Sequence, residues 1–168
     1  EPGAGNLISG NVGQGIFIIS QSNANTVQGN IIGLDATGHF PLPNTGSAAV
    51  SVNGTNTLVG GVLPGSRNVI YSPSYGVHIR TPNASQNVVQ GNYFGTDIDG
   101  MTAIDPIPLL SIGVRISGGS TNNTIGGTVP MAGNLFAVLD SGVVIRDAGT
   151  SENEVLGNLM GVDALGFR

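Results

Sequence analysis

The sequence predicts an all-β protein built as a parallel β-helix, a solenoid in which short strands wind into stacked coils. A nine-residue motif, Asn-x-Val-x-Gly-Asn-x-x-Gly, occurs three times, at residues 25–33, 87–95 and 153–161. Gly and Asn are scattered throughout, and no window keeps the apolar spacing of an amphipathic helix over three turns. Short apolar runs bounded by Gly and Asn are typical of strands. These runs form three sets that recur in a fixed order, and such internal repetition decides the fold.

The first set of expected strands begins with Asn and has a large apolar residue two positions later. We expect that apolar position to point inward in every coil, and the Asn side chains to stack as amide ladders along the solenoid. The pairs are Asn6 and Ile8, Asn30 and Ile32, Asn68 and Ile70, Asn92 and Phe94, Asn134 and Phe136, and Asn158 and Met160.

The second set alternates between apolar and variable residues, which predicts strands with one buried face. The expected inward residues are Ile16, Val50, Val77, Val114 and Val143, followed by Ile18, Val52, Ile79, Ile116 and Ile145. The expected outward row between them is Phe17, Ser51, His78, Arg115 and Val144.

The third set has the pattern Asn-x-x-x-Gly, at residues 25–29, 56–60, 87–91, 122–126 and 153–157. Successive Asn residues of the first set are 24, 38, 24, 42 and 24 residues apart, so short and long coils alternate. The long coils carry extra loops at residues 35–47, 60–67, 97–111 and 126–133. We expect residues 1–168 to form one domain, or one segment of a longer array, of about five to six coils stacked at the strand spacing of about 4.8 Å. Parallel connections favour right-handed coils.

Composition excludes several classes of function. The net charge is −5 and there is no Lys, which argues against nucleic acid as a partner. No apolar run is long enough to suggest a membrane span, and no pattern of a signal peptide is present, so we interpret Glu1 as a mature start or a cut inside a longer chain. The absence of Cys excludes disulfides and fits an exported or a cytosolic protein equally.

Together the motifs resemble those of right-handed parallel β-helix repeat proteins in the pectin-lyase-like superfamily. The resemblance rests on Asn-x-Val-x-Gly-Asn-x-Ile-Gly, then Asp-x-x-Gly, then Gly-Gly-x-x-Pro-x-x-Asn, and it covers the chain in two and a half copies. The closest similarity is to tandem-repeat members of large exported bacterial proteins, which implies an extracellular or cell-surface location. The superfamily includes polysaccharide-cleaving enzymes, phage tailspikes, adhesins and passive surface rods, so the fold alone does not choose an activity.

The sequence does not predict an enzyme. A glycosidase needs two carboxyl groups about 5 to 9.5 Å apart, but the outward row of the second set contains no carboxylate. The polygalacturonase signatures of paired Asp, Gly-His-Gly and Arg-Ile-Lys are absent, and Arg115-Ile-Ser117 is only a partial echo. We therefore expect no catalytic, cofactor-binding or metal-binding residues.

Three Arg and two His side chains are candidates for binding. His78 and Arg115 could be neighbours on adjacent coils, either as a ligand-binding or acid–base pair or as an exposed pair on a sheet surface, and we favour the exposed pair. Arg80 and Arg146 end equivalent strands and are expected to be solvated. His39 lies in an inserted loop with no second His nearby, so we do not expect it to bind a metal.

Three Asp residues occupy one repeat position: Asp35, Asp97 and Asp163 each begin Asp-x-x-Gly. Calcium is conceivable because Asp97, Asp99 and Asp105 supply oxygens. A type I turn, which favours Asp first and Gly fourth, is the simpler interpretation and the one we favour.

Three glycosylation motifs begin at Asn53, Asn83 and Asn122, and chance explains them in a chain so rich in Asn, Ser and Thr.

Our first hypothesis for function is a non-catalytic structural or adhesive rod segment. The alternatives are a carbohydrate-binding or carbohydrate-cleaving module and a self-assembling fibre subunit. We expect the open ends of the solenoid to expose unpaired backbone groups and core residues, and so to pair head to tail with copies of the chain.

Overall fold

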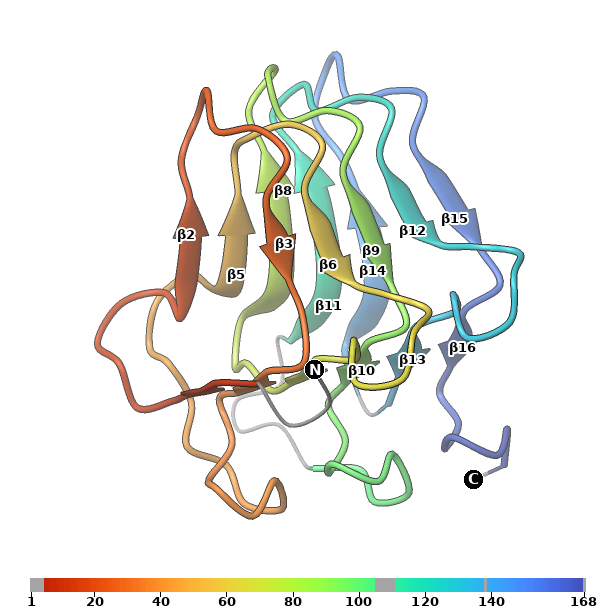
Figure 1. Cartoon of the computed structure of the whole chain (residues 1–168). Coiled ribbons are helices and arrows are strands. Elements are labelled where there is room, and N and C mark those ends of the chain that lie inside the picture. The colour runs from red at the N-terminus through yellow and green to blue at the C-terminus, as the bar shows by residue number, and fades with distance from the viewer. Residues whose placement is uncertain (1–4, 105–110, 138, 168) are drawn as a thin grey trace.

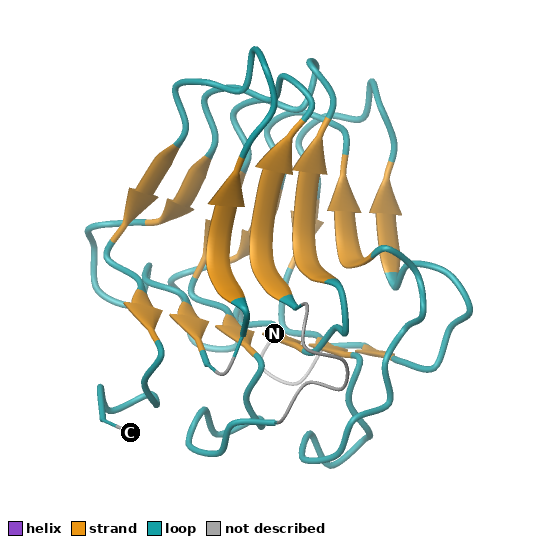
Figure 2. Ribbon diagram, turned by 180° about the vertical axis from the view of Figure 1, so that it is seen from behind, coloured by secondary structure: helices purple, strands orange, loops and turns teal. Residues whose placement is uncertain are grey.

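The computed structural model describes residues 5–104, 111–137 and 139–167. These residues contain sixteen strands in three parallel sheets and no helix (Figures 1 and 2). Within them there is accordingly no helix long and apolar enough to cross a membrane.

Each sheet collects one set of strands from the repeating pattern. The first sheet contains β1 (Leu7–Ile8), β4 (Ile31–Ile32), β7 (Val69–Ile70), β10 (Tyr93–Phe94), β13 (Leu135–Phe136) and β16 (Leu159–Met160). The second sheet contains β2 (Ile16–Ile18), β5 (Ala48–Val52), β8 (Tyr75–Arg80), β11 (Ile112–Ser117) and β14 (Ser141–Ile145). The third sheet contains β3 (Thr26–Val27), β6 (Leu58–Gly60), β9 (Val88–Gln90), β12 (Thr124–Gly126) and β15 (Glu154–Leu156).

The chain visits the three sheets in the same order each time. Each strand pairs in parallel with the strand three places earlier and the strand three places later. This all-β arrangement is compatible with the predicted parallel β-helix of three strands per coil, and we use "coil" below for one strand from each sheet in succession. In Figure 1 the first sheet forms the floor, and the second and third sheets rise from it as two walls.

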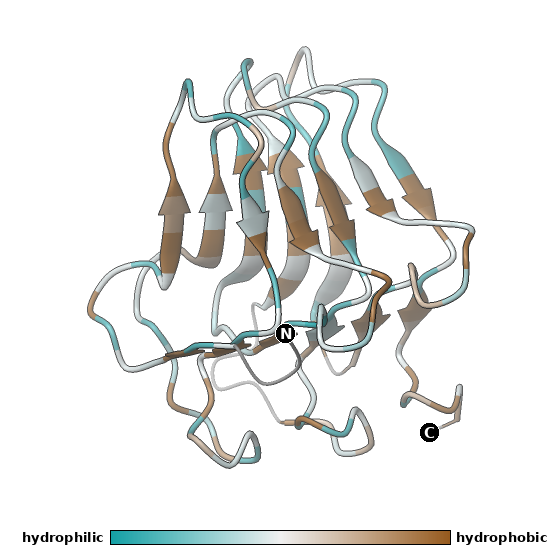
Figure 3. Cartoon of the chain, viewed as in Figure 1, coloured by the Kyte–Doolittle hydropathy of each residue, from teal (hydrophilic) through white to brown (hydrophobic). Residues whose placement is uncertain are grey.

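The predicted inward row of the first sheet is confirmed in the central coils. Ile32, Ile70, Phe94 and Phe136 are all buried. The rings of Phe94 and Phe136 stack with centroids 4.8 Å apart and planes inclined by 12°. Ile8 is half-buried and packs against this core. Figure 3 shows apolar residues on the strands of all three sheets.

The inward face of the second sheet is also as predicted. Val50, Val52, Val77, Ile79, Val114 and Ile116 are completely buried. The second residue of β8, β11 and β14 is Gly, and at each of these positions the backbone passes close to a side chain of the first sheet. A Cβ at Gly113 would lie 2.3 Å from the Phe136 ring, so only Gly leaves room for that ring.

The expected amide ladder runs through all six Asn residues of the first set. Each Nδ2 donates to the Oδ1 of the next Asn at 2.8–3.0 Å. Each Oδ1 from Asn30 onward also accepts the backbone N–H of the previous Asn. Asn68, Asn92 and Asn134 further donate to backbone carbonyls of the third sheet, which ties the first sheet to the third.

In the third set the predicted register is wrong for two of the five Asn residues. The structure aligns Thr57, Asn87, Asn123 and Asn153, because Asn87 donates to Asn123 and Asn123 to Asn153, both at 2.9 Å. Thr57 occupies this row and donates its backbone N–H to Asn87 Oδ1. Asn56 and Asn122, which the spacing to the following Gly selects, stand one residue earlier. The reason is that the third strand of each long coil is followed by two Gly residues in a row, at 60–61 and 126–127. The pattern Asn-x-x-x-Gly ends at the first Gly of each pair, whereas the strand register aligns the second.

The position before that row is a left-handed corner in every coil. Its φ values lie between 50° and 58°, and none of its residues is Gly: they are Ala24, Asn56, Gln86, Asn122 and Glu152. By contrast, Gly33 ends β4 with a φ of 81°, and a Cβ there would lie 2.0 Å from the Tyr71 carbonyl oxygen. Gly33 is required both by conformation and by space.

The two outer edges of the three sheets differ in exposure. At the edge formed by β14, β15 and β16, the inward residues Ile145, Val155 and Met160 are 42 %, 40 % and 46 % exposed. At the edge formed by β1, β2 and β3, Ile18 and Val27 are buried and Ile8 is half-buried. We expected exposed core residues at both edges, and the described residues show them mainly at the β14–β16 edge.

Candidate functional site

The outer face of the second sheet carries a polar cluster, which we call the outer-face cluster. Its members come from three adjacent strands: Ser51 from β5, Tyr75, His78 and Arg80 from β8, and Arg115 and Ser117 from β11. The strand register places Ser51 and Arg115 on either side of His78, and Ser117 beside Arg80. Figure 2 shows this sheet from its outer side.

His78 lies at the centre of the cluster and is 7 % exposed. Its Nε2 lies 2.8 Å from Ser117 Oγ, and its ring meets that of Tyr75 edge-on with centroids 4.9 Å apart. Burial lowers the pKa of His78, and the positive charges of Arg115 and Arg80 lower it further, to about 4, while Asp147 acts in the opposite direction. The imidazole is therefore neutral at neutral pH.

Tyr75 holds the side chain of Arg115. An Nη1–H of Arg115 donates to the Tyr75 hydroxyl, and the Arg115 guanidinium carbon lies 4.9 Å from the centre of the Tyr75 ring. The ring also contacts His78. Tyr75 thus fixes a cation and an imidazole next to each other on the sheet surface.

The cluster contains buried polar atoms without hydrogen-bond partners. Eight such side-chain atoms occur in the described residues, and four of them are Ser51 Oγ, His78 Nδ1, Arg80 Nε and Arg115 Nε. A fifth, Asn53 Oδ1, belongs to the residue that follows β5. Each unpartnered buried group costs about 1–3 kcal/mol, so this concentration on one face requires an explanation.

The expectation of an exposed His78–Arg115 pair is therefore wrong in one respect. The two residues are register neighbours, as expected, but His78 is buried and Arg115 and Arg80 are half-buried. Alternation of residues along a strand predicts which side faces outward, but not whether neighbouring side chains cover that side. Arg146 is exposed, as expected, and pairs with Asp147 at 2.9 Å.

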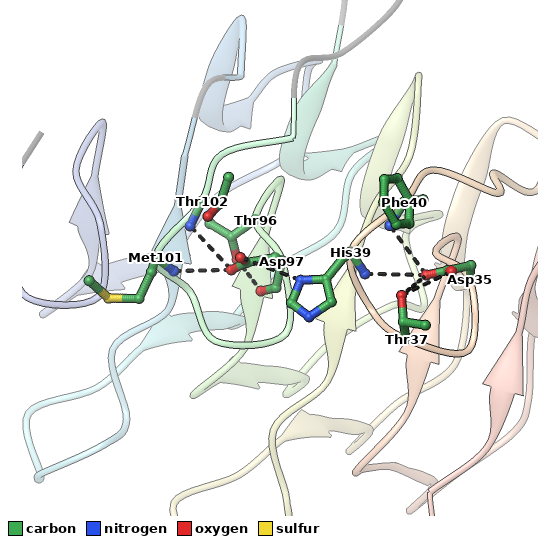
Figure 4. Close-up of polar contacts among 8 residues, drawn as sticks. All are labelled: Asp35, Thr37, His39, Phe40, Thr96, Asp97, Met101 and Thr102. Atoms are coloured by element: carbon green, nitrogen blue, oxygen red, sulfur yellow. Dashed lines mark hydrogen bonds and ion pairs between the residues drawn. The ribbon is translucent and has the colours of Figure 1, made fainter.

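The Asp residues of the inserted loops form turns, as we favoured. Asp35 Oδ1 accepts the Thr37 hydroxyl and the backbone N–H groups of His39 and Phe40 (Figure 4). The Asp35 carbonyl accepts the Gly38 N–H at 3.0 Å. The hydroxyl of Thr37 lowers the pKa of Asp35, burial acts in the opposite direction, and the amides of Phe40 and His39 lower the pKa further.

Asp97 and Asp163 repeat this turn. Asp97 is 6 % exposed and accepts the backbone N–H groups of Met101 and Thr102. Burial raises the pKa of Asp97, but hydrogen bonds from Thr102 and Met101 outweigh it, so the pKa is lowered overall. Asp163 Oδ1 accepts the N–H groups of Leu165 and Phe167, both at 2.9 Å.

These loops stack on one another although they come from alternate coils. The Ile98 N–H donates to the Gly38 carbonyl at 3.0 Å, and the Ala164 N–H donates to the Gly100 carbonyl at 2.9 Å. His39 Nδ1 lies 3.7 Å from Asp97 Oδ2 (Figure 4). The Asp-x-x-Gly pattern describes each turn separately and so does not predict this contact between two loops.

The calcium alternative gains no support from the described residues. They contain no group of three or more His, Cys, Asp or Glu side chains placed to hold a metal ion. The Asp97 carboxylate oxygens are engaged by backbone amides and His39. Asp105, the third residue of that hypothesis, lies outside the described residues.

The three glycosylation motifs differ in accessibility. Asn53 is 7 % exposed, which leaves no access for a glycan, whereas Asn83 and Asn122 are exposed.

Comparisons of the chain with protein-family models, with curated proteins and with solved structures found no match. The function of the chain must therefore be argued from its own geometry.

Proposed function

We propose that the chain is a non-catalytic segment of a structural or adhesive rod, outside the cell or at the cell surface, in which further coils continue the three sheets. The proposal includes right-handed coils and a relationship to the pectin-lyase-like proteins, as the sequence motifs suggest.

One observation carries this proposal: the core is open at the β14–β16 edge. Ile145, Val155 and Met160 are 40–46 % exposed there, whereas their register partners one coil earlier are buried. A hollow beside this edge is lined by apolar side chains, among them Val129, Met131 and Leu159. Apolar core positions at the end of parallel sheets are suited to an additional coil.

The distribution of carboxylates supports a non-catalytic role. Among the described strands, only β15 carries a carboxylate, Glu154. Two carboxyl groups facing one substrate are the usual requirement for glycoside hydrolysis. The carboxylates of Asp35, Asp97 and Asp163 already accept hydrogen bonds from backbone N–H groups of their own turns.

Assembly is tested with the isolated 168-residue chain by light scattering and electron microscopy at micromolar concentration. We expect head-to-tail association into filaments, because a contact between unlike surfaces that does not close gives filaments. Val155→Lys should suppress association by placing a charge on the open core. Leu165→Lys adds the same charge at an exposed loop residue and should not. A wild-type chain that stays monomeric would contradict self-assembly.

The absence of catalysis is tested separately. Incubation with pectin or alginate should release neither new reducing ends nor unsaturated products. Turnover that disappears in Asp97→Asn or Asp140→Asn would contradict the non-catalytic proposal.

A further inference from the structure

The outer-face cluster contains hydrogen-bond donors that the fold does not use. The guanidinium Nε–H groups of Arg80 and Arg115 and the hydroxyl of Ser51 are buried and unpartnered. When Ser117 Oγ donates to His78 Nε2, the proton of the neutral ring resides on Nδ1, which then becomes a fourth unpartnered donor. Ser51 is 1 % exposed and His78 is 7 % exposed, so water cannot freely serve these groups.

The charge of the cluster is unusual for this chain. The protein carries a net charge of −5 and contains five cationic residues, two of which are Arg80 and Arg115. The strands that carry the cluster, β5, β8 and β11, contain no carboxylate. The acidic group that influences His78 is Asp147, which follows β14 and is paired with Arg146. Among the described residues neither Arg80 nor Arg115 forms an ion pair, and the one carboxylate that acts on Arg115, Asp147, is itself paired with Arg146.

We infer that the outer-face cluster is a binding site for an oxyanion, namely a sulfate, phosphate or carboxylate group. The half-buried Arg80 and Arg115 are the donors that the ion reaches first, and Ser51 and His78 become donors when the side chains over them move aside. Hydrogen bonds from cationic groups to an oxyanion are short and strong, and Arg presents donors in a planar fork that suits these anions. Tyr75 acts as a positioning residue because it holds Arg115 and contacts His78. This inference does not depend on assembly of the rod.

Binding should be linked to protonation of His78. The groups that face this ring are Ser51 on β5, Tyr75 and Arg80 on β8, and Arg115 and Ser117 on β11, with Asp147 acting from beyond β14. The two Arg cations and burial disfavour the imidazolium form. A bound anion would counter both effects, since an opposite charge nearby favours the charged form of a titratable group.

The experiment follows both imidazoles by nuclear magnetic resonance during pH titration of the whole chain, with and without sodium sulfate. The chain has two His residues, so His39 serves as an internal control. At equal ionic strength we expect sulfate to raise the pKa of His78 by about one pH unit or more and to leave the resonance positions of the His39 ring unchanged. No response of His78 to sulfate, phosphate or acetate would overturn the inference, as would an equal response of both residues.

Matched variants separate a specific site from general charge effects. Arg115→Gln and Arg80→Gln should each weaken sulfate binding at least about tenfold, as expected for removal of a charge-assisted bond. Arg67→Gln removes the same charge from a residue that stacks on Tyr93 elsewhere, and should bind sulfate like the wild type. Equal weakening in Arg67→Gln would overturn the inference. Each variant is first checked for an unchanged circular dichroism spectrum, and Arg115→Lys keeps the charge if Arg115→Gln fails to fold.

The oxyanion could be a free ion or a substituent of a polymer, and two further probes distinguish these sources. Dextran sulfate that binds far more tightly than free sulfate, while dextran does not bind, would identify a polymer-borne group. Equal affinity for free sulfate and for the sulfate groups of the polymer would identify a site for small anions.

Discussion

Two buried polar regions of this protein differ in how their hydrogen-bonding groups are satisfied. In the ladder of the first sheet, Asn68 and Asn92 donate and accept along the row, and they also bind backbone carbonyls of the third sheet. On the outer face of the second sheet, Ser51 and His78 are also buried but keep polar atoms without partners. The ladder therefore stabilises the fold, whereas the unpartnered atoms of the outer-face cluster destabilise it.

This difference separates polar groups that hold the fold from polar groups that are available to something else. A buried amide with all its partners stabilises a unique register, whereas a buried donor without a partner destabilises the fold until it acquires one. Substitutions in the ladder should be costly, and substitutions in the outer-face cluster should be mild or even favourable. The following predictions test this contrast.

The largest effect is expected for Val114→Asp, which places an unpaired carboxylate at a completely buried position facing the core. We expect a loss of more than about 4 kcal/mol in the free energy of unfolding, measured by urea titration. Arg115→Ala, one residue further and on the outer face, should cost about 1 kcal/mol or less. Comparable losses for the two variants would mean that the inner and outer faces are assigned wrongly.

Asn92→Leu keeps the side-chain volume but removes the hydrogen bonds of the ladder residue. We expect a loss of about 2 to 4 kcal/mol, because the Val59 carbonyl and the Asn68 N–H lose their buried partner. The control is Asn83→Leu at an exposed position, which should stay within about 0.5 kcal/mol of the wild type. If Asn92→Leu were as mild as Asn83→Leu, the ladder would not be a stabilising feature of the fold.

Acid should destabilise the protein through His78. Its folded pKa of about 4 is below the ordinary value of 6.5, so the unfolded chain binds more protons between these two pH values. Stability is therefore highest above pH 6.5 and falls as the pH decreases towards 4, by at most about 3 kcal/mol. The lowered pKa values of Asp35, Asp97 and Asp147 add a loss of stability that begins only below about pH 5, so the slope between pH 6.5 and 5 belongs to His78. Denaturant titrations across the window should show the slope in the wild type and a flatter profile in His78→Gln.

The smallest effect is expected for Ser51→Ala. The Ser51 hydroxyl is buried and unpartnered, so its removal should leave stability unchanged or raise it by up to about 1 kcal/mol. Differential scanning calorimetry of the two proteins at pH 7 measures this. A clear loss of stability would indicate that the hydroxyl already has a partner that holds the fold.

Much of the fold could be predicted from the sequence because its repeats impose the same local chemistry on every coil. The apolar residue two positions after each Asn specified the inward row from Ile32 to Phe136, and alternation specified the buried face of the second sheet. The register failed at Asn56 and Asn122, because the Gly pairs at 60–61 and 126–127 each offer two Gly residues to align, and Asn122 is also followed by a second Asn. Only backbone pairing distinguishes these alignments.

The candidate site was harder to predict than the fold. The adjacency of His78 and Arg115 follows from the repeat, but the burial of His78 depends on how Tyr75 and the two Arg side chains lie across the sheet. Long flexible side chains adopt these positions through tertiary contacts that have no period in the sequence. The Tyr at position 75, at the start of β8, was the one available signal, since an aromatic residue there can cover its neighbours.

The stacking of loops from alternate coils limits how a chain of this kind can change its length. The backbone bonds from Ile98 to Gly38 and from Ala164 to Gly100 bridge a short coil each time. Insertion of one short coil would add about 4.8 Å between two loops and break such a bond, whereas insertion of a short coil with its long neighbour would reproduce it. Duplication and deletion should therefore be tolerated in steps of about two coils, the 62- and 66-residue intervals that separate the motif copies at residues 25, 87 and 153. An engineered rod of adjustable length would be assembled from the same paired unit.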